Sequence, residues 1–165
     1  RHARFSTWRA EPTPGRLAAR RRVSPVLAAA LGLWVLVQVA LPLRHFAIPG
    51  NSNWTEEGHM FAWHMMLRDK RGTVVFELTD GDSTWQVDPR DHLTGPQAHE
   101  LAWYPAGLVQ FAHHLSDIHD GAEVRAITSV SLNGRTHQPI VDPEVDLASL
   151  PTTWRGHASW IVPLD

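Results

Sequence analysis

The sequence predicts an α+β fold, in which one transmembrane helix is followed by an extracytoplasmic, mostly antiparallel sheet domain with one packed helix. Three observations support this prediction. Residues 25–43 are apolar over a membrane length, several short segments alternate in hydrophobicity between turn signals, and one later segment repeats its apolar residues every three or four positions. The predicted parts are a basic cytoplasmic loop at 1–24, a transmembrane helix at 25–44 and an extracytoplasmic domain at 45–165.

Charge and cysteine content narrow the function classes. The chain up to Phe46 holds eight arginines and one acid, whereas the rest holds seven Lys or Arg and sixteen Asp or Glu. An acidic domain repels phosphate backbones, so we expect no nucleic-acid partner. Cysteine is absent, which excludes disulfides, thiolate metal sites and a cysteine nucleophile.

The apolar run at 25–43 carries Gln38 as its only polar side chain. At about 1.5 Å per residue it approaches the thickness of the hydrocarbon core, and Pro25 suits a first helical turn. Two alternatives stay open: a cleaved signal peptide whose charged region is residues 20–22, and a buried helix of a soluble protein. Because the chain starts with Arg1 and not with Met, we expect a fragment or a processed product.

The arginines around this run predict its orientation. Four precede it closely, at positions 16, 20, 21 and 22, whereas Arg44 and His45 alone follow it closely. Positive residues favour the cytoplasmic side, so the acidic domain is expected outside the cytoplasm.

Turn signals divide the first half of the outer domain. Residues 61–67 and 73–78 flank a turn at 69–72 and predict a hairpin. A second tight turn at 80–82 precedes a brief strand at 84–87.

The second half begins with the predicted helix. It starts at Pro105 and ends before Gly121. A strand at 123–132, a type I′ turn at Asn133 and Gly134, a return strand at 136–141 and a closing segment at 159–162 complete the predicted sheet.

Two groups of polar residues were candidates for chemistry. Glu56 and Glu57 allow an acid and base pair, but consecutive residues rarely converge on one atom, so Thr55 and both acids are expected to cap a short helix. The group His113, His114, Asp117 and His119 places His113 and Asp117 four residues apart, as two metal ligands on a helix would be. No second cluster has ligand spacing, so a solvated helix face and no metal are expected.

Five segments together resemble the vitamin K-dependent gamma-glutamyl carboxylase family, including bacterial relatives with the horizontally transferred transmembrane domain. They are Asn-Trp-Thr at 53–55, Phe-Ala-Trp-His-Met-Met at 61–66, Ser-Leu-Asn-Gly-Arg at 131–135, Asp-Pro-Glu-Val-Asp-Leu at 142–147 and Ser-Trp-Ile-Val-Pro-Leu at 159–164. The resemblance covers residues 41–165.

The resemblance implies a multi-helix membrane enzyme, a lyase and epoxidase. Such enzymes use O2 and CO2 to epoxidise vitamin K hydroquinone and to convert glutamate in a peptide to gamma-carboxyglutamate. The implied partners are the lipid bilayer, the other transmembrane helices of the parent protein and a glutamate-containing peptide. Bacterial relatives need not carboxylate peptides, so the resemblance indicates quinol epoxidation more firmly than carboxylation.

The resemblance also implies a substrate-binding set just past the membrane exit. Its members are His59, Trp63, His64 and Arg68, joined by Trp160 near the end of the chain. Arginine binds carboxylates through two parallel hydrogen bonds. This chain departs from the carboxylase at His59, where the carboxylase has Tyr, and at Arg68, where it has His. The alternative is a strand in which Phe61, Trp63, Met65 and Leu67 point to the core.

No catalytic residue is assigned to this chain. The family's catalytic lysine lies upstream of the matched segment, and Lys70, the only lysine here, falls in a predicted hairpin turn and makes a poor buried base. The isolated chain is therefore expected to be inactive. Trp54, Trp154 and Trp160 are expected as core or interface anchors. The alternative function is a single-pass, membrane-anchored extracytoplasmic binding module without catalysis.

Overall fold

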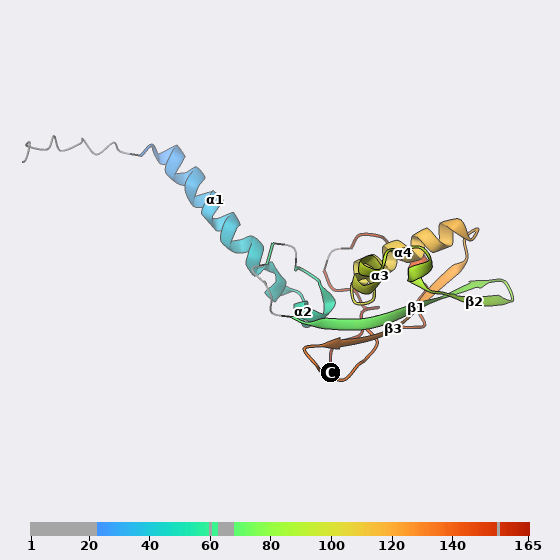
Figure 1. Cartoon of the computed structure of the whole chain (residues 1–165). Coiled ribbons are helices and arrows are strands. Elements are labelled where there is room, and N and C mark those ends of the chain that lie inside the picture. Colours follow the sequence, from blue (N-terminus) through green and yellow to red (C-terminus); the bar gives the residue numbers. More distant parts are fainter. Residues whose placement is uncertain (1–22, 60, 63–67, 155) are drawn as a thin grey trace, which may run out of the picture. The chain divides into compact units, whose positions relative to one another are not determined.

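A computed structural model describes residues 23–59, 61–62, 68–154 and 156–165 (Figure 1). The chain divides into two compact units, residues 1–36 and 37–165. The sheet, the clefts and the charged cluster described below all lie within the second unit.

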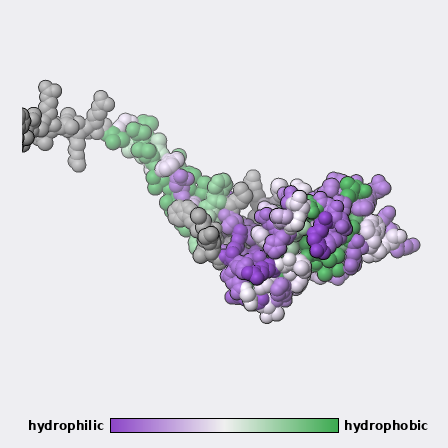
Figure 2. Space-filling model, viewed as in Figure 1, coloured by the Kyte–Doolittle hydropathy of each residue, from purple (hydrophilic) through white to green (hydrophobic). Residues whose placement is uncertain are grey.

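Helix α1 (Pro25–Leu43) covers the predicted apolar run. Residues 25–47 form the one described segment that is long and apolar enough to cross a membrane, judged by length and composition. Hydrophobic side chains cover the surface of this helix (Figure 2). A short 3-10 turn, η1 (Arg44–Ala47), follows, and α2 (Ser52–Thr55) begins after Asn51, whose side chain accepts a hydrogen bond from the Asn53 backbone.

Three antiparallel strands form the sheet in the order β2-β1-β3. Their bounds are β1 (Lys70–Asp80), β2 (Ser83–Val87) and β3 (Glu123–Leu132). A tight turn at Gly81, with a φ of +56°, joins β1 to β2. Both this turn and β3 were predicted from the sequence, and the prediction of an α+β fold is confirmed.

Helices and a 3-10 turn occupy the connection between β2 and β3, and a further 3-10 turn follows β3. They are η2 (Pro89–Asp91), α3 (Gly95–Leu101), α4 (Pro105–Ile118) and η3 (Leu147–Ser149). The prediction of α4 is confirmed, and its Phe111 ring lies 5.1 Å from that of Phe76 on β1. Helix α3 was missed, because its seven residues are too few to show a clear period.

The predicted first hairpin is wrong. Residues 70–72 belong to β1 and do not form a turn, and β1 pairs with β2 and β3. Most of the expected partner segment, 61–67, lies outside the described residues. Phe61 has a φ of +65° and is 68% exposed, which contradicts its predicted place in a core strand.

The return and closing strands are also wrong. Asn133 and Gly134 have φ values of +53° and +75°, as a type I′ turn requires. Beyond that turn, the described pairing is limited to isolated bridges, Val130 with Gln138 and Val141 with Ile161. Pro139 follows Gln138 and has no N–H to donate, so it interrupts the ladder.

Candidate functional site

Side chains from the end of α2 and the start of β1 meet in a buried charged cluster. We call this set, His59, Glu56, Arg68 and Lys70, the Glu56 cluster. Glu56 ends α2 in the left-handed conformation, with a φ of +63°, and Lys70 is the first residue of β1. The turn after α2 and the β1 strand therefore bring together residues that are up to fourteen positions apart.

Lys70 lies at the buried side of this cluster. Its side chain is 2% exposed, and Nζ donates to the Trp54 carbonyl oxygen at 2.6 Å and to Oε1 of Glu56 at 2.7 Å. The same nitrogen lies 5.8 Å and 5.7 Å from the ring centres of Trp54 and Trp103. Burial lowers the pKa of Lys70, and the Glu56 carboxylate opposes that shift. The prediction of Lys70 in a hairpin turn is therefore wrong.

Arg68 lies at the more open side of the cluster. Its Nη1 pairs with Oε2 of Glu56, and its Nη2 lies 3.1 Å from Nε2 of His59, which accepts because a guanidinium only donates. The Arg68 side chain is 23% exposed, against 2% for Lys70. Each oxygen of Glu56 thus has its own cation, and the cluster holds two cationic side chains for one carboxylate.

Glu57 points to different partners. Its side chain is 3% exposed; Oε1 accepts from the Ala158 N–H at 2.6 Å, and Oε2 lies 3.2 Å from Nδ1 of His157. Glu57 thereby holds the segment near the end of the chain against the turn after α2. The two adjacent glutamates do not form an acid and base pair, and the predicted capping role is also wrong, because both follow α2.

A cleft of about 360 Å³ lies beside the cluster, and we call it the Glu56 cleft. Both glutamates line it, opposite Tyr104 and Gln110 and the loop that contains Trp154. The remaining lining residues are Arg44, Ile48, Thr55, Gly58, Ala106, Thr152, Thr153 and Gly156. Hydroxyl, amide and carboxylate groups and the Arg44 guanidinium thus face one open space, and Glu56 is the member of the cluster that lines it.

Two members of the predicted substrate-binding set come together here, since His59 and Arg68 are in contact. Trp63 and His64 lie outside the described residues. Trp160 does not line the Glu56 cleft, but its ring lies 4.9 Å from that of Trp154, which does. Trp54 is fully buried and donates from Nε1 to the Val162 carbonyl at 2.7 Å, so its predicted core role is confirmed.

Sequence reasoning missed Glu56 and Lys70 as parts of the site. One signal was present: Lys70 has the same parity as Val74, Phe76 and Leu78, the residues of β1 that face the core. A lysine in register with core positions must find a partner when it is buried.

Metal binding finds no support in the described part of the chain, which contains no group of three or more His, Asp or Glu residues able to hold an ion. His113, one of the two candidate ligands on α4, has its Nε2 2.7 Å from the Leu150 carbonyl oxygen.

The fold and the site define a class of protein, an α+β domain that follows an apolar, membrane-length helix and carries a buried cationic cluster close after it. Residues 23–165 match the family model described as vitamin K-dependent gamma-carboxylase, lumenal domain, and the chain belongs to that family. The suspected family is thus confirmed. No solved structure matches the chain.

Proposed function

We propose that this chain is the outer part of a membrane-embedded, gamma-carboxylase-like enzyme, and that the Glu56 cleft receives the carboxylate of an acceptor glutamate. The observation that carries the proposal is the charge of the Glu56 cluster, where Arg68 and Lys70 share the single carboxylate of Glu56. One further carboxylate would balance the cluster. Membership in the family supports the class of reaction.

Of the two cations of the cluster, Arg68 is the better placed to bind that carboxylate; it does not line the cleft itself and connects to it through its ion pair with Glu56, a lining residue. Lys70 is sealed beneath Trp54 and Trp103, whereas Arg68 is partly exposed and presents a planar fork of donors. Glu56 and His59 hold its two terminal nitrogens in place. An arginine that is fixed in this way loses little conformational freedom when it binds a carboxylate.

In this proposal the chain binds and orients the acceptor and supplies no catalytic base. The ammonium of Lys70 already donates to two oxygens, so it has no approach to a substrate carbon. Trp160 acts indirectly, by supporting the Trp154 ring at the cleft.

The quinol is assigned to other parts of the parent enzyme. In the proposed reaction, O2 oxidises vitamin K hydroquinone, or a related quinol, to its epoxide, and CO2 adds to the acceptor glutamate. The Glu56 cleft has two carboxylates, those of Glu56 and Glu57, in a lining that also contains apolar side chains, and we assign none of the described residues to the quinol. We place it among the membrane helices of the parent protein.

The orientation and partners follow from the same proposal. The arginines before the apolar helix favour a cytoplasmic N-terminal side, and in this proposal the acidic domain lies outside the cytoplasm. The lipid bilayer and the remaining helices of the parent protein then surround α1, whose apolar side chains are exposed in the structure.

The test is an assay of the intact parent protein in detergent with vitamin K hydroquinone, with and without a glutamate-containing peptide and labelled CO2. Epoxide together with label in the peptide supports the full proposal. Epoxide without label indicates a quinol oxygenase that does not carboxylate. If neither product forms, the proposal fails, and the chain is better explained as a membrane-anchored binding module.

A further inference from the structure

Strand β1 has an edge that no other described strand covers. It pairs with β3 along almost its whole length, from Lys70 to Thr79. On its other side it pairs with β2 only from Phe76 to Asp80. After Val87 the chain turns away at Asp88 into η2, so among the described residues no strand lies beside residues 72–75 of β1 on that side.

The backbone groups of Gly72 and Val74 point to this uncovered edge. Directly opposite residues in an antiparallel pair either exchange both hydrogen bonds or exchange none. Val130, the partner of Gly72 in register, uses its N–H and its carbonyl for Gln138, at 2.9 Å each. Gly72 therefore turns its N–H and carbonyl away from β3, and Val74, two residues on, does the same.

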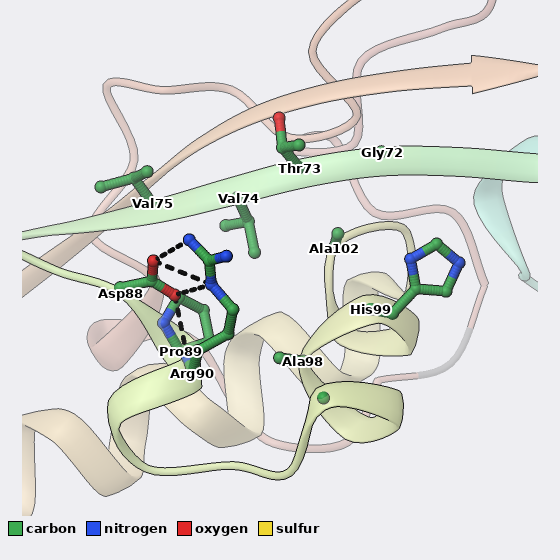
Figure 3. Close-up of a pocket in the computed structure, with 11 residues that line it drawn as sticks. Gly72, Thr73, Val74, Val75, Asp88, Pro89, Arg90, Ala98, His99 and Ala102 are labelled. Carbon is green, nitrogen blue, oxygen red and sulfur yellow. Dashed lines mark hydrogen bonds and ion pairs between the residues drawn. The ribbon is translucent and has the colours of Figure 1, made fainter.

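No hydrogen bond joins these backbone groups to another described residue outside the sheet ladders. They face a cleft of about 290 Å³, which we call the edge cleft. Residues 72–75 form one wall, and the opposite wall consists of residues 88–90 and of Gly95, Ala98, His99 and Ala102 on one face of α3. Figure 3 shows β1 crossing above α3, with Arg90 and His99 on opposite sides of Ala98.

We propose that the edge cleft binds an extended peptide, which adds to β1 as a strand in line with β2, with small side chains toward α3 and basic residues at its flanks. Backbone donors and acceptors that repeat every second residue are matched by another extended backbone at about 4.8 Å. The small side chains of Ala98 and Ala102 leave room for it.

The charges around the edge cleft favour a basic peptide. Arg90 is closed on Asp88, because its Nε lies 3.0 Å from both carboxylate oxygens. This pairing lowers the pKa of Asp88 to about 2, so the pair stays intact and neutral at ordinary pH. Asp91 follows Arg90 in the sequence, and Glu100 follows His99. Both are exposed, and neither forms an ion pair with another described residue. The domain as a whole is acidic, which steers cationic segments toward it.

This inference stands apart from the proposed function. The edge cleft and the Glu56 cleft share no lining residue. A peptide at the edge cleft can therefore be detected whether or not the Glu56 cleft binds a carboxylate.

The first experiment measures amide hydrogen exchange by NMR on the full chain in nanodiscs. The free chain should exchange the amides of Gly72 and Val74 quickly and those of Arg71 and Thr73 slowly, since the latter bond to β3. The probe is an eight-residue peptide of alternating valine and threonine with a lysine at each end. Its addition should slow exchange at Gly72 and Val74. Saturation without protection at these two amides would overturn the inference, as would no saturable binding up to about 1 mM.

Two altered peptides distinguish recognition of the peptide backbone from nonspecific binding. The same peptide with N-methylated central amides keeps its side chains and charge but cannot donate, and it should bind at least about tenfold more weakly. A version with glutamates in place of lysines should also bind more weakly, most clearly at low salt. Equal affinity for the methylated and unmethylated peptides would contradict strand addition.

A matched pair of substitutions separates the two clefts. Ala98→Leu places a larger side chain in the edge cleft, and Ala106→Leu makes the same change in the Glu56 cleft. Ala98→Leu should weaken binding of the lysine-flanked peptide at least about tenfold, a loss of about 1.4 kcal/mol, and Ala106→Leu should leave it unchanged. The reverse pattern would overturn the inference. If Ala98→Leu does not fold, the hydrogen-exchange and N-methylated peptide experiments test the inference instead.

Discussion

Oε1 of Glu56 lies 2.7 Å from Nζ of Lys70, and both side chains are almost completely buried. This contact joins the turn after α2 to the first residue of β1, and Arg68 closes the other side of the same carboxylate. A buried ion pair contributes little net stability by itself, but removal of one partner leaves a charge without compensation. The start of the sheet and the Glu56 cluster are therefore expected to depend on each other.

Lys70→Met tests that dependence. The substitution keeps an apolar stem beneath Trp54 but leaves the Glu56 oxygen and the Trp54 carbonyl without their donor. We expect the free energy of unfolding to fall by about 3–5 kcal/mol, measured by chemical denaturation. Arg71→Met is the control, because Arg71 is 75% exposed and its pair with Asp69 is worth less than about 1 kcal/mol. Equal losses for the two variants would contradict the buried network.

The pH dependence of stability offers a second view of Lys70. The pKa of Lys70 is lowered in the folded state from the usual 10.5. At any pH between the folded-state pKa and 10.5, the unfolded chain therefore binds more protons than the folded chain. The free energy of unfolding should therefore rise as the pH increases through the folded pKa toward 10.5. With one lysine, one tyrosine and no cysteine, few other groups titrate there. If the free energy of unfolding no longer rises with pH in Lys70→Met but still rises in Tyr104→Phe, the pH dependence is due to Lys70.

Local patterns in the sequence were enough to predict some of the regular elements. The alternation at 123–132, the turn residues Asn133 and Gly134, and the period after Pro105 each reflect contacts within a few residues, and each prediction is confirmed. The prediction of β1 was too short at its start. Lys70, Arg71 and Gly72 are typical turn residues, and only pairing with β3, far along the chain, makes them a strand.

The site was predicted less well, for the same physical reason. His59 and Arg68 were selected through the family resemblance and do come into contact, but the role of Glu56 depends on a left-handed residue that ends α2. A local hydrophobic pattern predicts neither the positive φ of Glu56 nor its contact with Lys70, fourteen residues away. Glu57 shows the same limit, since its partner Ala158 lies 101 residues away.

Glu57→Ala tests whether the end of the chain depends on that contact. The carboxylate accepts from the Ala158 N–H at 2.6 Å, and its loss leaves a backbone donor unpaired in a buried place. We expect a loss of about 1–3 kcal/mol in the free energy of unfolding and faster amide exchange at Ala158. Glu144→Ala, at a residue whose side chain is 82% exposed, should change stability by less than about 0.5 kcal/mol.

Gly72→Ala tests the close approach of β1 and β3. A Cβ at this position would lie 2.9 Å from the Ser129 carbonyl oxygen and 2.9 Å from Cγ2 of Val130, and the carbonyl belongs to a strand that cannot easily move. We expect a loss of about 1–3 kcal/mol from this crowding. Gly95→Ala is the control, since nothing lies within 4 Å of its added Cβ. If the two variants were equally stable, the register of β1 against β3 would have to differ.

Arg68 is the residue on which the proposed function depends most directly. Arg68→Ala removes the exposed cation of the Glu56 cluster, and the loss of a charge-assisted hydrogen bond costs about 1.5–3 kcal/mol, or about ten- to hundredfold in affinity. In the parent enzyme we expect the KM for the glutamate peptide to rise by this factor, with a smaller change in kcat. Arg68→Lys should restore the positive charge but not the planar pair of guanidinium donors. It should therefore restore only part of the affinity. Arg71→Ala, three residues along and exposed, should leave KM unchanged. An unchanged KM in Arg68→Ala would remove the Glu56 cluster from substrate binding, because Lys70 is too deeply buried to take over the contact.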